Sequence, residues 1–243
     1  MNEKPTHLDL FSGIGGFALA AGWAGFRTIG FCDNEPYAQA VIKKHWPEVP
    51  IHGDIKAFDG TAYRGVTLLT GGFPCQPFSC AGKQRGKDDD RYLWPEMLRV
   101  IQEARPTWIV GENVAGIINL GLEKACADLE GIGYEVQPLV IPACAISAQH
   151  RRDRVWIIAN TNSIRQNLRK KTIDKEKKQR TQNIIKRCSF REILDRWEGW
   201  KSTPYICRSD DGIPHRSHRL KGLGNAIVPQ VAYQIIKGIR GLL

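Results

Sequence analysis

The sequence contains no run of about eighteen apolar residues and no CxxC pair. Without such a run we expect no transmembrane helix and no membrane partner. The cysteines are few, odd in number and scattered, so we expect neither a metal site nor a disulfide framework. The first residues also lack the basic-then-apolar order of a secretory signal, which leads us to expect a cytoplasmic protein.

Acidic residues are also fewer than basic ones, 25 against 35, so the formal net charge is +10. The excess is concentrated between Arg165 and Arg191, where eleven basic residues stand against two acidic ones. A clustered positive segment is typical of a polyanion partner such as nucleic acid. A solvated insert would have the same composition, so charge alone leaves both interpretations open.

Short apolar runs alternate with helical patterns through the first two-thirds of the chain. This alternation predicts an α/β fold, a doubly wound and mostly parallel sheet whose ligands bind at the carboxyl ends of the strands. The expected strands are 7–11, 27–33, 65–72, 106–113, 134–141 and 154–160, and the expected helices are 36–46, 92–104, 117–130 and 227–239. We therefore predict one domain from 1–160 plus 222–243, and a small basic region at 161–221.

Three features suggest an adenosine-bearing cofactor. The stretch "LDLFSGIGGFALA" (8–20) predicts a strand, a glycine turn and a helix, so that a ligand can approach the helix N-terminus closely. Glu35 follows the second strand, where an acid can bind the ribose hydroxyls, and Asp54 follows a third strand, where it can meet an adenine amino group. Each has an alternative: a tight turn, a helix N-terminal acid and a turn aspartate. Together they fit a cofactor better than three unrelated turns.

Cys75 lies between Pro74 and Pro77 on a glycine-flanked loop, a setting that suggests an exposed thiol. Glu112 in "VGENV" ends an apolar strand at the same sheet edge, where partial burial should raise its pKa and favour the protonated carboxyl. A thiolate and a neutral acid suit one reaction well. The thiolate adds to C6 of cytosine while the acid engages N3, and C5 then becomes nucleophilic enough to take a methyl group from a sulfonium donor.

Five stretches now stand in order: "DLFSGIGGF", "GGFPCQPFS", "GENV", "HRRDRVWIIA" and "GNAIVPQVA", spanning residues 9–232. In these the chain resembles the DNA (cytosine-5)-methyltransferases of the small bacterial or phage type. The resemblance implies a Rossmann-like, class I methyltransferase fold that uses S-adenosylmethionine and releases S-adenosylhomocysteine. It also implies methylation of cytosine within a specific short sequence of double-stranded DNA, on a flipped-out base, through a covalent bond between Cys75 and C6.

The resemblance also assigns residues. Catalytic roles are implied for Cys75, Glu112, Arg152 and Arg154, with Arg154 expected at the base and Asn113 holding the strand end. Cofactor contacts are implied for Phe11, Ser12, Gly13, Gly15, Gly16, Asp33, Glu35, Asp54, Ile55, Pro74, Asn225 and Ala226, with Phe11 on the adenine. DNA contacts are implied for Gln76, Ser79, Arg85, Arg165, Lys170 and Lys171.

The chain departs from the family pattern in three places. His150 occupies the position of a frequent glutamine, with Gln149 one place earlier, so that role stays unassigned. The recognition region and the segment before Gly224 are short, which leaves the DNA sequence and the tightness of its recognition open.

Other functions are compatible with parts of the sequence. A branch of the same family modifies tRNA with these motifs, and a relative without catalysis could simply bind DNA. A dehydrogenase would use the glycine turn but leaves Pro-Cys-Gln and Glu-Asn-Val unexplained. We expect a monomer, with a restriction endonuclease as a genetic rather than a physical partner.

Overall fold

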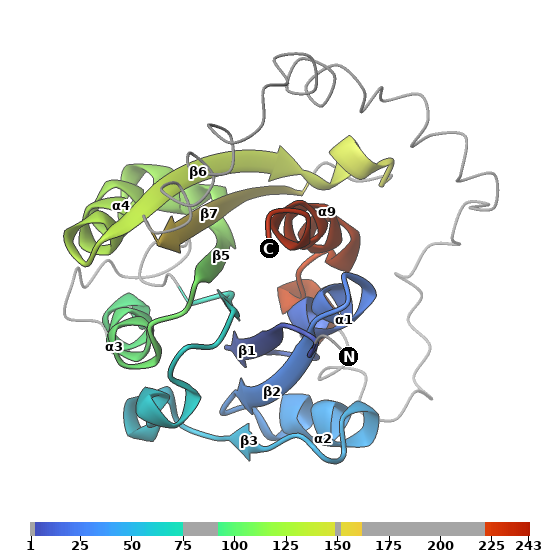
Figure 1. Ribbon diagram of the computed structural model, residues 1–243. Coiled ribbons are helices and arrows are strands. Elements are labelled where there is room, and N and C mark those ends of the chain that lie inside the picture. The colour runs from blue at the N-terminus through green and yellow to red at the C-terminus, as the bar shows by residue number, and fades with distance from the viewer. Residues whose placement is uncertain (1–2, 75–91, 149–151, 162–221) are drawn as a thin grey trace, which may run out of the picture.

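The structure is a computed structural model that describes residues 3–74, 92–148, 152–161 and 222–243. Its described part forms a seven-stranded sheet in the order β3-β2-β1-β4-β5-β7-β6 (Figure 1). The strands are β1 (Thr6–Leu10), β2 (Arg27–Cys32), β3 (Ile51–His52), β4 (Leu68–Gly71), β5 (Trp108–Val114), β6 (Tyr134–Pro142) and β7 (Asp153–Thr161). Each predicted strand is present, so the α/β interpretation of the apolar runs is confirmed.

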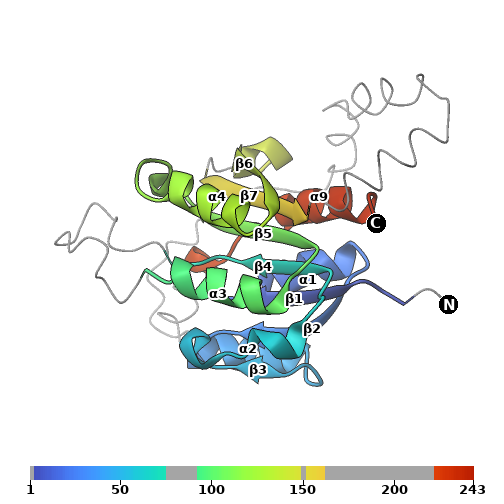
Figure 2. The same ribbon diagram turned by 60° about the vertical axis from the view of Figure 1, so that its left-hand side comes forward.

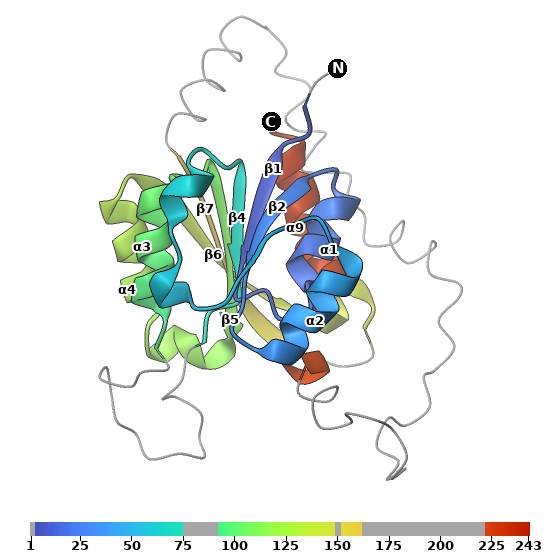
Figure 3. The ribbon, with the colours of Figure 1, turned by 90° about the horizontal axis from the view of Figure 1, so that it is seen from below.

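Helices cover both faces of the sheet. They are α1 (Gly16–Trp23), α2 (Pro36–His45), α3 (Trp94–Ala104), α4 (Leu122–Gly131) and α9 (Pro229–Arg240), with short 3₁₀ turns η1 (Ile55–Ala57), η2 (Gly60–Tyr63), η4 (Ala115–Asn119) and η5 (Ala143–Ile146). Seen from below, α3 and α4 lie on one face and α1, α2 and α9 on the other, as in a doubly wound fold (Figure 3). Within the described residues no helix is long and apolar enough to cross a membrane.

The helix predicted near 117–130 is interrupted. The chain instead forms the 3₁₀ turn η4 and then α4, which begins after Gly121. Gly121 has extended backbone, at φ −166°, and glycine's lack of helical preference makes it a natural break.

The sheet is mostly parallel, as predicted, but β7 runs against both of its neighbours. Strands β1 to β5 each run parallel to the strands they pair with among themselves. Because β7 is reversed, its first residues lie at the edge where β5 ends, and Arg154 pairs in register with Val114. Side chains at the start of β7 and at the end of β5 therefore share one site.

The two larger apolar clusters of the described residues hold the layers together. On one face Trp94, Met97 and Ile101 of α3 pack with Leu8 and Leu10 of β1, all at most 1% exposed. Figure 2 brings α3 and α4 forward over this face. On the other face α1 and α9 pack together against the sheet, and their cluster includes Phe17, Trp156, Val231 and Ile236. Burial of such side chains contributes about 1.5–3 kcal/mol each, so α9 fixes the chain's return onto the sheet, as predicted.

A buried polar chain links the central strands. Thr70 Oγ1 donates to Asp9 Oδ1 at 2.8 Å and lies 2.8 Å from His7 Nε2, while His7 Nδ1 lies 2.9 Å from Thr28 Oγ1. Because the Thr70 hydroxyl proton goes to Asp9, the geometry favours a neutral His7 that donates from Nε2. Burial accordingly lowers the pKa of His7 to about 3, and burial raises the pKa of Asp9 well above its usual value.

Candidate active site

The turn after β1 is built on left-handed backbone. Phe11 has φ 52°, Gly13 φ 52° and Gly15 φ 85°, and such a conformation is rare for a residue as bulky as phenylalanine. A Cβ on Gly15 would lie 2.6 Å from the Trp46 ring, and one on Gly16 would lie 2.8 Å from Ile227 Cγ1. Glycine is therefore required here both for the turn and for close contact with the returning C-terminal segment.

Asp33 ties this turn to the end of β2. Its Oδ2 accepts a hydrogen bond from Gly13 N at 2.7 Å, and its Oδ1 accepts one from Glu35 N at 2.9 Å. The backbone of Glu35, which precedes α2, is thereby fixed relative to the glycine turn. One carboxylate thus sets the spacing between the first two cofactor segments that the sequence predicts.

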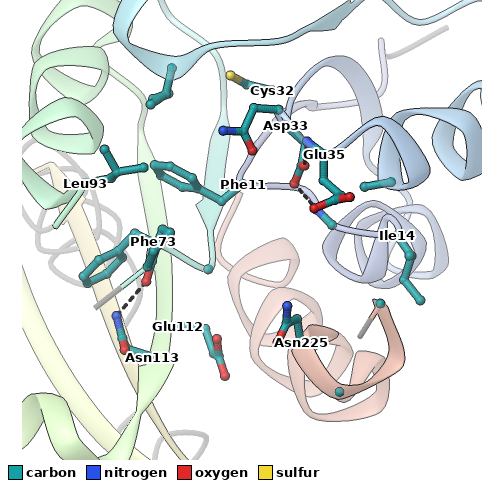
Figure 4. A pocket seen from close by; sticks show the side chains of 18 of the residues that line it. Phe11, Ile14, Cys32, Asp33, Glu35, Phe73, Leu93, Glu112, Asn113 and Asn225 are labelled. Atoms are coloured by element: carbon teal, nitrogen blue, oxygen red, sulfur yellow. Dashed lines mark hydrogen bonds between the residues drawn. The ribbon is translucent and has the colours of Figure 1, made fainter. Parts of the chain in front are cut away.

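A cavity of about 930 Å³ opens at the carboxyl ends of β1, β2, β4 and β5. Figure 4 shows Phe11, Asp33 and Glu35 on one side of it and Glu112 and Asn225 on the other. The predicted cofactor residues in its wall are Phe11, Gly13, Asp33, Glu35, Asp54, Ile55, Pro74 and Asn225. A smaller adjoining cavity is lined by Ser12, Gly16 and Ala226, together with Phe11 and Asn225. The structure thus gathers segments that are far apart in the sequence around one space.

Gly15 is the predicted cofactor residue that lines neither cavity, because it faces Trp46. The cavity also has wall residues that sequence reasoning missed, among them Tyr37, Lys56, Phe73 and Leu93. Phe73 stands beside Pro74 in "GGFPC" and could have been found from that motif. Leu93 precedes a helix in an ordinary apolar pattern, and nothing in its sequence context signals a ligand.

Asp54 lines the cavity and also holds its own turn. Its Oδ1 accepts a hydrogen bond from Lys56 N at 2.9 Å, so it begins the 3₁₀ turn η1. Behind this turn Arg99 donates to the carbonyl oxygens of Ile55 and Phe58, at 2.6 and 3.0 Å. Asp54 is therefore a turn residue that also lines the cavity, and its contact with an adenine amino group stays a prediction.

Glu112 lies at the end of β5 with only 8% of its surface exposed. Arg154 Nε on β7 lies 2.8 Å from its Oε1. Burial raises the pKa of Glu112, and the nearby Arg154 and Arg152 only partly offset that rise. The expected upward shift of the Glu112 pKa is confirmed, and its cause is the desolvation inferred from the apolar strand.

The end of β4 is fastened to the end of β5. Asn113 Nδ2 donates to Phe73 O at 2.9 Å, and Asn113 Oδ1 accepts from Val114 N at 2.9 Å. This bond places Pro74 in the same cavity wall as Glu112. Cys75, the next residue, lies outside the described residues.

Arg152, just before β7, is turned toward the C-terminal segment. Its Nη2 donates to Gly224 O and to Ala226 O, each at 2.7 Å. Of the two predicted arginines, Arg154 lines the large cavity beside Glu112.

Several predicted residues lie outside the described part of the chain: Cys75, Gln76, Ser79, Arg85, Gln149, His150, Arg165, Lys170 and Lys171. The predicted region 161–221 is described only at Thr161. Among the described cysteines, Cys144 is exposed and Cys32 is buried. Cys144 lies on the short turn η5, which follows the edge strand β6.

The groups that line the cavity suit an adenosine-bearing cofactor. It offers an aromatic ring at Phe11 and carboxylates at Glu35 and Asp54. It also offers open backbone at Gly13, where an added Cβ would have no atom within 4 Å. Its polar groups stand at strand ends, as ligand groups do in doubly wound folds.

Comparison with known proteins agrees with this geometry. A family described as C-5 cytosine-specific DNA methylase matches residues 6–203. The Type II methyltransferase M.NgoMIV of Neisseria gonorrhoeae is 37% identical over 162 residues, covering 65% of this chain and 52% of the relative. M.Eco47II of Escherichia coli is 34% identical over 171 residues, covering 67% and 41%. The chain thus spans about half, or less, of the length of these two relatives.

The fold is shared with a solved methyltransferase structure. The chain matches S. pombe Dnmt2 methyltransferase with a TM-score of 0.56 and 24% identity, covering 65% of this chain and 51% of that one. At that identity the likeness concerns the fold alone, and it agrees with the Rossmann-like sheet described above.

Proposed function

Because the chain belongs to the C-5 cytosine-specific DNA methylase family, we propose that it methylates C5 of cytosine in double-stranded DNA. S-adenosylmethionine would supply an electrophilic methyl group on sulfonium sulfur. Phe11, Glu35, Asp54 and Asn225 would hold it in the cavity described above. The relatives named as Type II methyltransferases support an enzyme of the restriction-modification type.

The observation that carries the proposal is the pairing of Glu112 with Arg154 in the wall that Pro74 shares. It gives a buried carboxyl of raised pKa beside the predicted position of a thiol. A protonated carboxyl can donate to N3 of cytosine, and Arg154 can stabilise the negative charge left when that proton is given up.

The proposed reaction adds a thiolate to C6, transfers a methyl group to C5 and then eliminates the thiolate. The Cys75 thiolate forms a bond to C6 while Glu112 gives a proton to N3, and the ring becomes an enamine. C5 would then take the methyl group that the sulfonium donor supplies, and S-adenosylhomocysteine would be the leaving group. A base removes the proton from C5, the bond between sulfur and C6 breaks, and N3 returns its proton to Glu112.

The target base must leave the DNA stack for this reaction, at a cost of a few kcal/mol. We propose that the basic region 161–221 serves as the target-recognition region and holds the phosphates while the base is extruded. Arg165, Lys170 and Lys171 are the proposed phosphate contacts there, and Gln76, Ser79 and Arg85 are the proposed DNA contacts near the thiol.

The test is transfer of a labelled methyl group from S-adenosylmethionine to unmethylated plasmid DNA, with bulk tRNA as the parallel substrate. We expect DNA to be labelled, Cys75→Ser to abolish labelling, and Cys144→Ser, which alters an exposed thiol, to leave it unchanged. Labelling of tRNA alone would show an RNA enzyme instead. DNA binding without labelling would show a non-catalytic relative.

The covalent step has its own test. In DNA that carries 5-fluorocytosine, C5 holds fluorine in place of the proton that must leave, so the bond from Cys75 to C6 should persist. We expect a protein–DNA adduct that survives denaturation, present for Cys144→Ser and absent for Cys75→Ser. Bisulfite sequencing of DNA from expressing cells would then identify the recognised sequence.

A further inference from the structure

The segment from Gly222 to Ile227 forms a wall of both cavities. Gly222, Gly224 and Asn225 line the larger cavity, and Asn225 and Ala226 line the smaller one. A Cβ on Gly222 would lie 3.3 Å from Ile14 and 3.4 Å from Tyr37, so the segment packs closely against the glycine turn and α2. Asn225 is the residue of this segment that has a polar side chain and lines both cavities. Figure 4 shows its side chain facing the larger cavity.

Arg152 holds this segment at two points. A single guanidinium nitrogen, Nη2, donates to Gly224 O and Ala226 O at 2.7 Å each. These carbonyls flank Asn225, so fixing both of them fixes the backbone on either side of it. Arginine is suited to such a contact because its planar group carries several donors and stays charged.

Arg152 makes these two hydrogen bonds although its burial, its backbone conformation and its unsatisfied Nε are all unfavourable. Burial lowers the pKa of Arg152, and the neighbouring Arg154 charge lowers it further. Its backbone has φ 36°, in the left-handed region, and among the described residues its buried Nε has no hydrogen-bond partner. Strain and a buried unsatisfied donor concentrated in one residue are typical of functional positions.

We propose that Arg152 is a positioning residue that holds Asn225 in the wall of the cofactor cavity, rather than a residue that contacts the flipped cytosine. The inference rests on the proposed function, because the ligand of the cavity is taken to be the S-adenosyl cofactor. Arg154, two residues along the chain, contacts Glu112 at 2.8 Å. Arg154 in β7 thus pairs with the acid, and Arg152, just before the strand, holds the wall of the cofactor cavity.

The experiment measures the Kd for S-adenosylhomocysteine by calorimetry, beside the KM for DNA and kcat. Arg152→Met should raise that Kd by about tenfold, since two hydrogen bonds from a charged donor are lost. Asn225→Ala should raise it similarly, and the double variant should bind no more weakly than either single one, because both changes remove the same contact. A residue that contacts the base would instead alter kcat or the KM for DNA and leave cofactor affinity unchanged.

Arg105→Met is the matched control. Arg105 also has left-handed backbone, at φ 48°, and donates to a carbonyl, that of Ile132 at 3.1 Å, outside the cavity. It should leave the Kd for S-adenosylhomocysteine unchanged. If Arg152→Met fails to fold, Arg152→Lys carries the test, because a shorter ammonium cannot hold both carbonyls equally and should raise the Kd about threefold.

Two outcomes overturn the inference and are distinguishable. If the unaltered protein binds S-adenosylhomocysteine and the Arg152 variants bind it as tightly, Arg152 does not position the cofactor wall and the proposed function stands. If the unaltered protein does not bind S-adenosylhomocysteine at all, the proposed cofactor is wrong and the inference is wrong with it.

Discussion

Arg154 and Glu112 meet across two antiparallel strands, with Nε of the arginine 2.8 Å from Oε1 of the glutamate. The side chains are 21% and 11% exposed, so solvent screens the pair only weakly. The arginine keeps an acid with a raised pKa from being driven higher by its burial. The pair therefore sets how readily Glu112 holds and releases a proton.

Replacing Arg154 should reveal this control directly. In Arg154→Met the carboxyl keeps its burial but loses its nearest cation, so its pKa should rise further. Carbon-13 NMR of the glutamate carboxyls, followed against pH, would report the Glu112 titration. Assignment comes from the signal missing in Glu112→Gln. A Glu112 pKa that falls or stays unchanged would contradict this account of the site.

Glu112→Gln should slow methyl transfer by roughly 10²–10⁴-fold, the usual contribution of a positioned acid. The amide can still reach N3 but has no proton to give up. Single-turnover transfer of labelled methyl to DNA would measure the effect, with the Kd for S-adenosylhomocysteine expected to change little. Glu123→Gln on the exposed surface of α4 is the control, and equal rates for the two variants would remove Glu112 from the mechanism.

The buried His7 should govern stability in acid. Its pKa is about 3 when folded and about 6.5 when unfolded, so only the unfolded chain takes up its proton between those values. The free energy of unfolding should therefore fall as pH drops from about 6.5 to about 3, by up to about 1.4 kcal/mol per pH unit from this residue.

Urea unfolding of His7→Gln and of the unaltered protein between about pH 6.5 and about pH 3 tests this contribution of His7 to the free energy of unfolding. The stability difference between them should shift in favour of the variant as pH falls. Asp9, whose pKa is raised, contributes the opposite slope but is present in both proteins. His45→Gln, on the exposed end of α2, should keep the original slope, and a pH-independent difference for His7→Gln would refute the assignment.

Gly15→Ala should lower the free energy of unfolding by roughly 2 kcal/mol or more. The added Cβ would meet the Trp46 ring at 2.6 Å, on backbone with φ 85°. Gly22→Ala is the matched control in the following helix, where nothing lies within 4 Å and alanine should stabilise by about 0.5–1 kcal/mol. Urea denaturation of both variants measures the difference, and equal effects would contradict the packing described for the turn.

Much of the fold can be predicted because its signals are local. The strands are visible as apolar runs bounded by glycine, proline and polar residues, and Pro36 marks the start of α2 as expected. The break at Gly121 escapes prediction because the apolar pattern continues across it, whereas the turn η4 packs Ile117 into the core. The apolar pattern along the chain does not show which side chains pack into the core.

The site can be predicted in part. The positions of Glu35, Asp54 and Glu112 at the cavity follow from strand order, since groups that follow parallel strands meet at one edge. The motif assigns Gly15 to the ligand, yet this glycine packs on Trp46, thirty-one positions away. Contacts between distant segments are set by packing, which a motif does not specify.

The α/β class, the glycine turn after β1 and the buried acid at the end of β5 can be predicted from the amino-acid sequence alone. These depend on residue type and on spacing along the chain, both of which are written in the sequence. The reversed direction of β7 is a property of the tertiary fold, and through it Arg154 reaches Glu112 while Arg152 reaches the carbonyls beside Asn225. The return of α9 depends on one apolar cluster that joins it to α1 and to Trp156 of β7, and such burial is a balance over many distant residues rather than a property of any short stretch.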